Sequence, residues 1–182
     1  MSADELRIGS RVLALARGDI TRFAADAIVN AANSALAGGG GVDGAIHRSG
    51  GPSLMAELRA RHPDGCPAGG AVATEAGELP ARWVFHAVGP RWRGARHGEA
   101  DLLASAYRAA LRLADARDVR TIAIAAISLG VYGYPLVEGA EIAVRTVAAH
   151  LGGRTSVERA TFVLFSDETY AAFARAVRAF QP

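Results

Sequence analysis

The chain has 182 residues, of which 51% are hydrophobic and 21% charged, and its formal net charge is +2 at pH 7. This composition is typical of one globular domain of ordinary size, it excludes a disordered chain, and the small net charge gives no support to nucleic acid as a partner. We expect neither a secretory leader, because the first residues are polar, nor a membrane span, because the longest uncharged run contains two glycines and a proline.

Short aliphatic runs alternate with helical patterns along the whole chain. In chain order, we predict strands over Arg11–Arg17 and Asp26–Ala31, helices over Gly44–Gly50 and Pro52–Ala60, strands over Ala71–Ala76 and Trp83–Gly89, a helix over Asp101–Arg117, a strand over Thr121–Ile127, a helix over Val137–Leu151, a strand over Ala160–Phe165 and a helix over Glu168–Phe180. The alternation predicts an α/β fold in one domain, with a mostly parallel sheet between helical layers.

Ligands of such sheets bind beyond the carboxyl ends of the strands. The loops that follow Ala31, Ile127 and Phe165 are therefore the candidate binding loops. The two neighbouring strands Ala71–Ala76 and Trp83–Gly89, joined by a turn-rich segment, are expected to pair antiparallel.

The loop after the second strand contains four consecutive glycines, residues 38–41, between Asn33 and Asp43. Glycines allow positive φ and let backbone N–H groups approach a ligand closely, and the following helix offers its positive N-terminal end to an anion. Since the loop joins a strand to a helix, we interpret it as a phosphate loop, against the alternative of a merely flexible connection.

The segment 39–44 also fits the G-x-G-x-x-G pattern of dinucleotide-binding proteins. We reject that interpretation, because the connection from the strand is too long for the tight turn of a Rossmann unit. It would also place Asp43 among the phosphates that it repels. That carboxylate is better explained by catalysis or by hydroxyl recognition.

A second loop of this kind, residues 128–135, follows the predicted central strand. Its two glycines permit tight turns, Ser128 supplies a hydroxyl, and Tyr132 or Tyr134 could pack against a sugar; a surface turn with aromatic packing is the alternative. Near the first strand, Asp19 follows a glycine. It fits either a helix cap or an acceptor for an exocyclic amine such as that of adenine.

Residue types that are rare or missing exclude several mechanisms. Cys66 is the only cysteine, so no internal disulfide can form and a cytoplasmic location is expected. The five histidines do not have the spacing of metal ligands, and we expect no metal and no cofactor. All twenty basic residues are arginine, which excludes Schiff-base and Walker-type lysines, and Ser128 lacks the surroundings of a nucleophile elbow.

The motifs together resemble the macrodomain family. They are GDIT at 18–21, IVNAAN at 28–33, GGGGVDGAIH at 38–47, CPAG at 66–69 and GVYGYP at 130–135. More narrowly, the chain resembles the MacroD-type branch, the bacterial O-acetyl-ADP-ribose deacetylases. The resemblance implies a three-layer α/β/α fold around a mixed, mostly parallel six-stranded sheet, in a single domain over residues 1–182 with a core at about 11–180.

The resemblance also assigns roles to single residues. Asp19 would bind the adenine amino group and Asn33 the distal ribose, and Asp43 with Asn33 would carry the catalysis. The other residues that it places against ADP-ribose are Ile20, Gly41, Val42, Ser128, Leu129, Gly130, Val131 and Tyr132. Its ligands would be ADP-ribose and its esters, with mono-ADP-ribosylated proteins as a further class of substrate.

Three positions are left open by the resemblance. Leu129 stands where the branch usually carries threonine, so its side chain could alter the diphosphate contacts or the loop's stability. Phe165 is a candidate for stacking on adenine. His47 is interpreted as a histidine packed locally on its helix, with support of the active site as the alternative.

The function expected from this resemblance is hydrolysis of an ester on the distal ribose, with Asp43 activating or orienting water. A module that binds ADP-ribose without turnover is the alternative, and the Asn33–Asp43 pair favours the enzyme because a pure binder does not need it. A dinucleotide-dependent oxidoreductase is disfavoured by chain length and by loop length.

Overall fold

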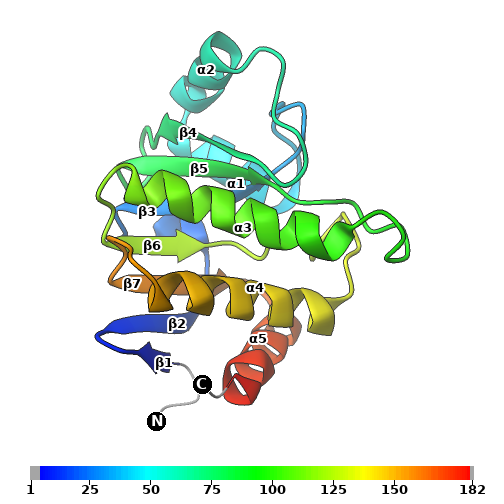
Figure 1. Ribbon diagram of the computed structural model, residues 1–182. Helices are drawn as coiled ribbons and strands as arrows, with labels where there is room; N and C mark the ends of the chain where they lie inside the picture. The colour runs from blue at the N-terminus through cyan, green and yellow to red at the C-terminus, as the bar shows by residue number, and fades with distance from the viewer. Residues whose placement is uncertain (1–4, 181–182) are drawn as a thin grey trace.

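The computed structural model describes residues 5–180 and contains one sheet of seven strands in the order β1-β2-β7-β6-β3-β5-β4 (Figure 1). The strands are β1 Glu5–Ile8, β2 Arg11–Arg17, β3 Ala27–Ala32, β4 Ala71–Glu75, β5 Trp83–Val88, β6 Thr121–Ile124 and β7 Arg159–Leu164. The helices are the 3-10 turn η1 Ile20–Arg22 and the α-helices α1 Gly41–Gly50, α2 Pro52–Arg61, α3 Glu99–Asp115, α4 Leu136–Gly152 and α5 Asp167–Ala179. No described helix is long and apolar enough to cross a membrane.

The sheet is mixed and mostly parallel, as predicted, but it has seven strands where six were expected. Strands β2, β7, β6, β3 and β5 run parallel, β4 pairs antiparallel with β5, and the additional strand β1 pairs antiparallel with β2. The strand missed was only four residues long, with Leu6 as its buried residue, and a two-residue turn joins it to β2. Pairing with β2, rather than its own short pattern, makes this segment a strand.

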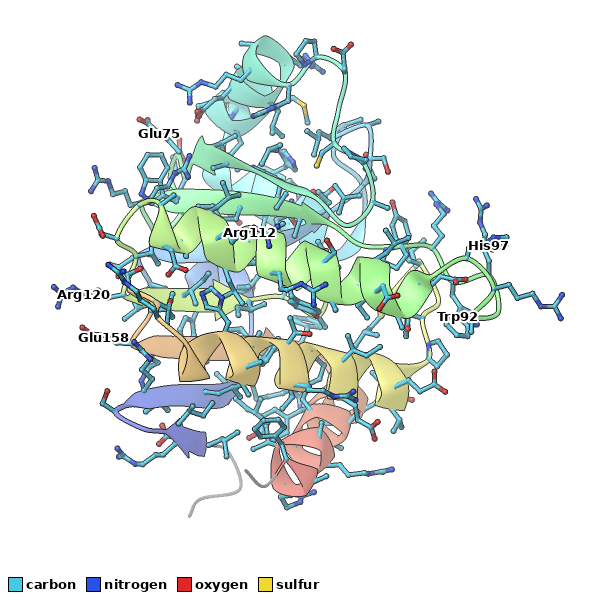
Figure 2. The ribbon with its side chains drawn as sticks, in the orientation of Figure 1. Glu75, Trp92, His97, Arg112, Arg120 and Glu158 are labelled. Atoms are coloured by element: carbon cyan, nitrogen blue, oxygen red, sulfur yellow. The ribbon has the colours of Figure 1, made fainter. Side chains whose placement is uncertain are left out.

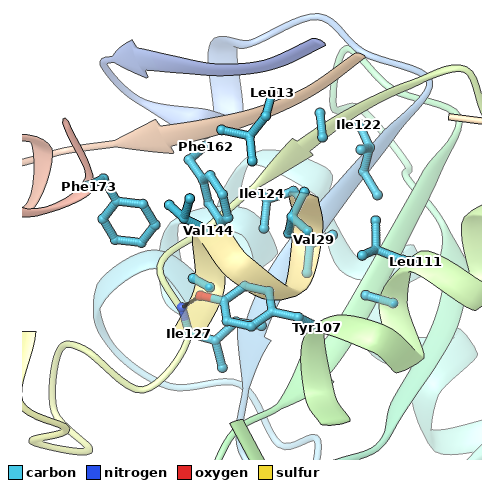
Figure 3. Packing of buried hydrophobic residues seen from close by; sticks show 14 of the residues in the cluster. Leu13, Val29, Tyr107, Leu111, Ile122, Ile124, Ile127, Val144, Phe162 and Phe173 are labelled. Carbon is cyan, nitrogen blue, oxygen red and sulfur yellow. Dashed lines mark hydrogen bonds between the residues drawn. The ribbon is translucent and has the colours of Figure 1, made fainter. Parts of the chain in front are cut away.

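Helices lie on both faces of the sheet. Helices α3 and α4 cross the front face in Figure 1, and α1 lies behind it. On the front face the core contains a row of aromatic rings, in which Phe162 of β7 lies 4.7 Å from Phe173 of α5 and 6.0 Å from Tyr107 of α3, between ring centroids (Figure 3). These ring contacts pack α3 and α5 against β7.

Strand β6 ends three residues before its predicted end. The chain leaves the sheet after Ile124, and the backbone N–H of Ile127 donates instead to the hydroxyl of Tyr107 at 3.0 Å (Figure 3). Burial raises the pKa of Tyr107, whose hydroxyl stays neutral. This buried bond fixes where the second glycine loop begins.

Helix α1 begins three residues earlier than predicted. Its first residue is Gly41 and its N-cap is Gly40, so Asp43 lies in the first helical turn. The remaining predicted elements agree with the observed ones to within about two residues at each end.

Candidate functional site

The candidate site lies at the edge of the sheet where the parallel strands end. Strands β2, β7, β6 and β3 are neighbours, so the loops that follow them meet at this edge, on the side where Trp92 and His97 are labelled in Figure 2. Arg120 and Glu158 mark the opposite edge. These loops and the first turns of η1 and α1 carry the residues proposed from the sequence: Asp19, Ile20, Asn33, Gly41, Val42, Asp43, Ser128, Leu129, Gly130, Val131 and Tyr132.

The first glycine loop is shaped by close backbone contacts. A Cβ on Gly44 would collide with the carbonyl oxygen of Gly39, and Gly41 has a φ of 57°. No side chain caps α1, because its N-cap is Gly40. The N–H groups of the first turn are therefore left for a ligand, which is the arrangement that binds anions at helix N-termini.

Asp43 is buried, with 6% of its surface exposed, yet it is held in the charged form. The side-chain amide of Asn30 donates to Asp43 Oδ1 at 2.7 Å, and His47 Nε2 lies 3.5 Å from the same oxygen. Burial opposes ionisation, but the hydrogen bonds from His47 and Asn30 outweigh it, so the pKa of the Asp43 carboxyl lies below its usual range. The carboxylate is ionised at neutral pH.

His47 is thus placed beside the predicted catalytic carboxylate rather than packed away from it. It follows Asp43 by one helical turn, so both side chains lie on the same face of α1. This geometry favours the second interpretation of His47, as a residue that supports the active site, over local packing on its helix.

Asn33 and Asp43 both lie beside Gly39. A Cβ at Gly39 would be 3.3 Å from Asp43 Oδ2 and 3.8 Å from Asn33 Nδ2. The amide of Asn33 donates to the carbonyl of Gly38 at 2.8 Å, and its oxygen accepts from the N–H of Ala37 at 3.3 Å. Asn33 therefore shapes the glycine loop in this structure, and its contact with the distal ribose remains a prediction.

Three buried polar residues in this region were not found from the sequence: Asn30, Thr74 and His86. Asn30 Nδ2 lies 3.2 Å from His86 Nδ1, and Thr74 Oγ1 lies 3.0 Å from His86 Nε2. Asn30 was visible as a polar residue inside the apolar pattern of β3, within the quoted IVNAAN motif. Thr74 and His86 gave no such signal, because only the pairing of β3, β5 and β4 brings them together.

Asp19 is a cap in this structure. Its Oδ1 accepts from the backbone N–H of Thr21 at 2.9 Å and from the Thr21 hydroxyl at 2.7 Å, which makes it the N-cap of η1. These hydrogen bonds lower the pKa of its carboxyl. Asp19 is nevertheless exposed, and its other oxygen, Oδ2, has no bonded partner among residues 5–180. The cap therefore leaves one oxygen for a ligand.

The second glycine loop is held in a strained conformation at its start. Ser128 is a buried non-glycine residue with a φ of 65°, and its Oγ has no hydrogen-bond partner among the described residues. Its carbonyl accepts from the N–H of Tyr134 at 3.1 Å, and Gly130 O accepts from Gly133 N at 2.9 Å. Such strain is typical of functional loops. The unpaired hydroxyl is therefore a candidate ligand contact.

The side chains of this loop divide between the core and the solvent. Leu129 packs inward against α4, where a Cβ on Gly139 would collide with it, so the Leu129 side chain anchors the loop to the core. Tyr134 is buried, with its ring centroid 4.7 Å from that of Trp92. Val131 is 90% exposed and forms the tip. Of the two tyrosines, only Tyr132 remains partly exposed.

Phe165 follows β7 at the same edge and is 80% exposed. Its carbonyl accepts from Nε of Arg17 at 3.0 Å, and the Arg17 guanidinium also pairs with Asp167. An exposed aromatic ring on a backbone held in place is a suitable platform for a base.

A model of the Macro domain family matches residues 29–143 of the chain. The chain is similar to a Klebsiella pneumoniae protein named O-acetyl-ADP-ribose deacetylase, with 54% identity over 160 residues that cover 87% of this chain and 91% of the relative. Its structure is similar to an Oceanobacillus iheyensis macrodomain solved with ADP, at a TM-score of 0.91 and 37% identity, covering 96% of this chain and 94% of that one. A Trypanosoma brucei macrodomain in complex with ADP-ribose has a TM-score of 0.82 and 40% identity, covering 91% of this chain and 68% of that one.

Proposed function

The chain belongs to the Macro domain family, and from this premise we propose that it binds ADP-ribose and hydrolyses ester-linked groups from it. The observation that carries the proposal is the buried, ionised Asp43 in the first turn of a helix that no side chain caps, where an anion such as phosphate binds favourably. A carboxylate weakens phosphate binding at such a position, so its presence favours a role in the reaction. Relatives named O-acetyl-ADP-ribose deacetylase support the same conclusion.

The two glycine loops bind the diphosphate, and they hold the distal ribose ester next to Asp43 and Asn33. Water adds to the ester carbonyl carbon, the bond from that carbon to the ribose oxygen breaks, and a carboxylic acid and a free ribose hydroxyl are formed. Asp43 accepts the proton of the attacking water and returns a proton to the departing ribose oxygen. If a phosphate oxygen of the substrate takes the proton instead, Asp43 orients the water.

An aspartate with a lowered pKa is a weak base, so most of the acceleration must come from positioning. Holding the reacting groups together can supply about 7–11 kcal/mol of barrier reduction in ideal cases. The second glycine loop is suited to that role, because the bond from Ile127 N to Tyr107 fixes its start and the bond from Tyr134 N to Ser128 O closes it.

Removing the carboxylate of Asp19 is expected to weaken ADP-ribose binding by about 1–3 kcal/mol, because the adenine amine loses a charged acceptor. Asp19→Asn is the more informative variant. Asparagine keeps one oxygen that can accept from Thr21, and hence the cap of η1. Its other polar atom is an amide nitrogen, and the side chain carries no charge. We expect calorimetry to show reduced affinity for both Asp19→Ala and Asp19→Asn, with unchanged unfolding of Asp19→Asn. Wild-type affinity in Asp19→Ala would mean that the residue only caps η1.

Turnover is expected to survive EDTA. Within residues 5–180, no group of three or more His, Cys, Asp and Glu side chains is arranged to hold a metal ion. The rate of ester hydrolysis should be measured before and after chelation, with dialysed enzyme as the reference. A rate that falls with EDTA and returns on adding a divalent ion would contradict the metal-free mechanism.

The acyl part of the ester separates two substrate classes: acetate on free ADP-ribose, and an aspartate or glutamate side chain of a mono-ADP-ribosylated protein. We propose that the site accepts both, because the ester linkage is the same. The test is incubation with O-acetyl-ADP-ribose and with protein modified at acidic residues, with release of acetate and of ADP-ribose followed in parallel. Binding of ADP-ribose without release from either substrate would establish the non-catalytic reader instead.

We propose a cytoplasmic location as well. The single cysteine, Cys66, is buried, and burial raises the pKa of its thiol, which suits a protein that needs no disulfide. Fractionation of cells that express the tagged chain would test this.

A further inference from the structure

A row of four buried polar side chains crosses the sheet toward the active site. Thr74 on β4, His86 on β5 and Asn30 on β3 are fully buried, and Asp43 on α1 is 6% exposed. Asn30 is in register with His86, and Thr74 is diagonal to His86 across the antiparallel pair, so the three side chains lie on the sheet face that α1 covers. Polar groups in a core are costly unless their hydrogen bonds are made.

The amide nitrogen of Asn30 determines which atoms of this row donate and which accept. Asn30 Nδ2 lies 2.7 Å from Asp43 Oδ1 and 3.2 Å from His86 Nδ1. An amide nitrogen only donates, so His86 Nδ1 must accept and cannot carry a proton. The proton of the ring is then on Nε2, which donates to Thr74 Oγ1 at 3.0 Å. His86 is thus a neutral imidazole in one tautomer.

Burial agrees with this assignment, because it lowers the pKa of His86 to about 3. The neighbouring His47 and His62 contribute to this lowering of the pKa, and Asp43 opposes it. The ring is therefore neutral at pH 7.

The neighbours of Asn30, and not Asn30 itself, determine which way its amide points. In the observed orientation Asn30 Oδ1 is buried and has no hydrogen-bond partner among the described residues. A proton on His86 Nδ1 would favour the opposite orientation, with Oδ1 toward the ring. That rotation would place Oδ1 against Asp43 Oδ1, where two oxygens repel each other and the carboxylate loses its donor.

We propose that Thr74 and His86 are positioning residues for the reaction: Thr74 selects the tautomer of His86, and His86 fixes the Asn30 amide that holds the Asp43 carboxylate. The inference rests on the proposed function, because its effect is on ester hydrolysis. Neither residue needs to touch the substrate.

Thr74→Val tests the first step, because valine has nearly the same shape and cannot accept from Nε2. The matched control is Thr74→Ser, which keeps the hydroxyl. We expect kcat for O-acetyl-ADP-ribose to fall by roughly tenfold to a hundredfold in Thr74→Val, a cost typical of losing the partner that orients an imidazole. Thr74→Ser should keep most of the activity. Affinity for ADP-ribose, measured by calorimetry, should change less than twofold in both.

The tautomer is measured independently of activity by 15N NMR of the histidine side chains, with the His86 signal assigned through its loss in His86→Asn. We expect an unprotonated Nδ1 in the wild type and a shift of the proton toward Nδ1 in Thr74→Val. His86→Asn also places an acceptor near the Nδ1 position, so it should retain more activity than His86→Gln, whose amide reaches the Nε2 position instead.

Two results would overturn the inference: a wild-type kcat in Thr74→Val, or a wild-type His86 protonated at Nδ1. A failure of the proposed function would give a different result from a failure of this inference. In that case the wild type releases no acetate, while the NMR signal of His86 still reports whether the tautomer is the one assigned.

Discussion

Replacing Asp43 by alanine is expected to remove nearly all turnover while ADP-ribose binding survives or improves. The carboxylate is ionised in the first turn of α1, where phosphates are expected to bind, so its charge repels the ligand in the ground state. Removal relieves this repulsion and eliminates the group that acts on water, which should lower the rate by about 10²- to 10⁴-fold. The paired measurement is single-turnover ester hydrolysis and equilibrium affinity for ADP-ribose.

The matched variant is Asp43→Asn, which keeps the volume of the side chain and an oxygen to accept from Asn30 or His47 but has no charge. It should lose turnover as alanine does, with a smaller effect on folding. An unchanged rate would show that Asp43 is not catalytic. If the rate and the affinity collapse together, the residue has a structural role in holding the glycine loop.

Gly44→Ala is expected to destabilise the protein and to weaken ADP-ribose binding. The new Cβ would meet the carbonyl oxygen of Gly39, a backbone atom that cannot move without displacing the first phosphate loop. Overpacking of this kind costs about 1–3 kcal/mol. For a chain of this size, each kcal/mol corresponds to a fall of about 2–4 °C in melting temperature.

Gly40→Ala is the control for this change. Gly40 has a φ of −95°, and a Cβ there has no atom within 4 Å, so its melting temperature should stay near that of the wild type. Thermal unfolding of the two variants, followed by circular dichroism, makes the comparison. Equal melting temperatures for Gly44→Ala and the wild type would show that the loop can shift at little cost.

The sequence predicted the central strands because buried parallel strands appear as short, nearly continuous apolar runs. Strand β2 was predicted with its observed bounds, and the antiparallel pairing of β4 with β5 was confirmed. Asp43 could be singled out because a carboxylate two residues after a run of four glycines is unusual for a phosphate loop. Each of these patterns lies within a short stretch of sequence, so it can be recognised without knowing the fold.

The missed features depend on contacts between distant segments. Strand β1 forms because β2 offers an unpaired edge, and four residues carry too little pattern to reveal it. Leu129 was recognised as unusual, but its inward direction depends on the space left by Gly139 on α4. The row from Thr74 to Asn30 exists only through the register of three strands.

Contacts with the core order the second glycine loop before a ligand binds, so binding costs little conformational entropy there. Tyr107 holds the N–H of Ile127, Leu129 packs under α4, and Trp92 N donates to Tyr132 O at 2.9 Å. Only the tip around Val131 is strongly exposed among these loop side chains, whereas freezing each residue of a flexible loop costs about 1–2 kcal/mol. Little of the interaction energy is then lost to ordering. We therefore expect the association rate of ADP-ribose to be limited by diffusion into the site rather than by loop closure, with affinity differences between ligands arising mainly from their dissociation rates.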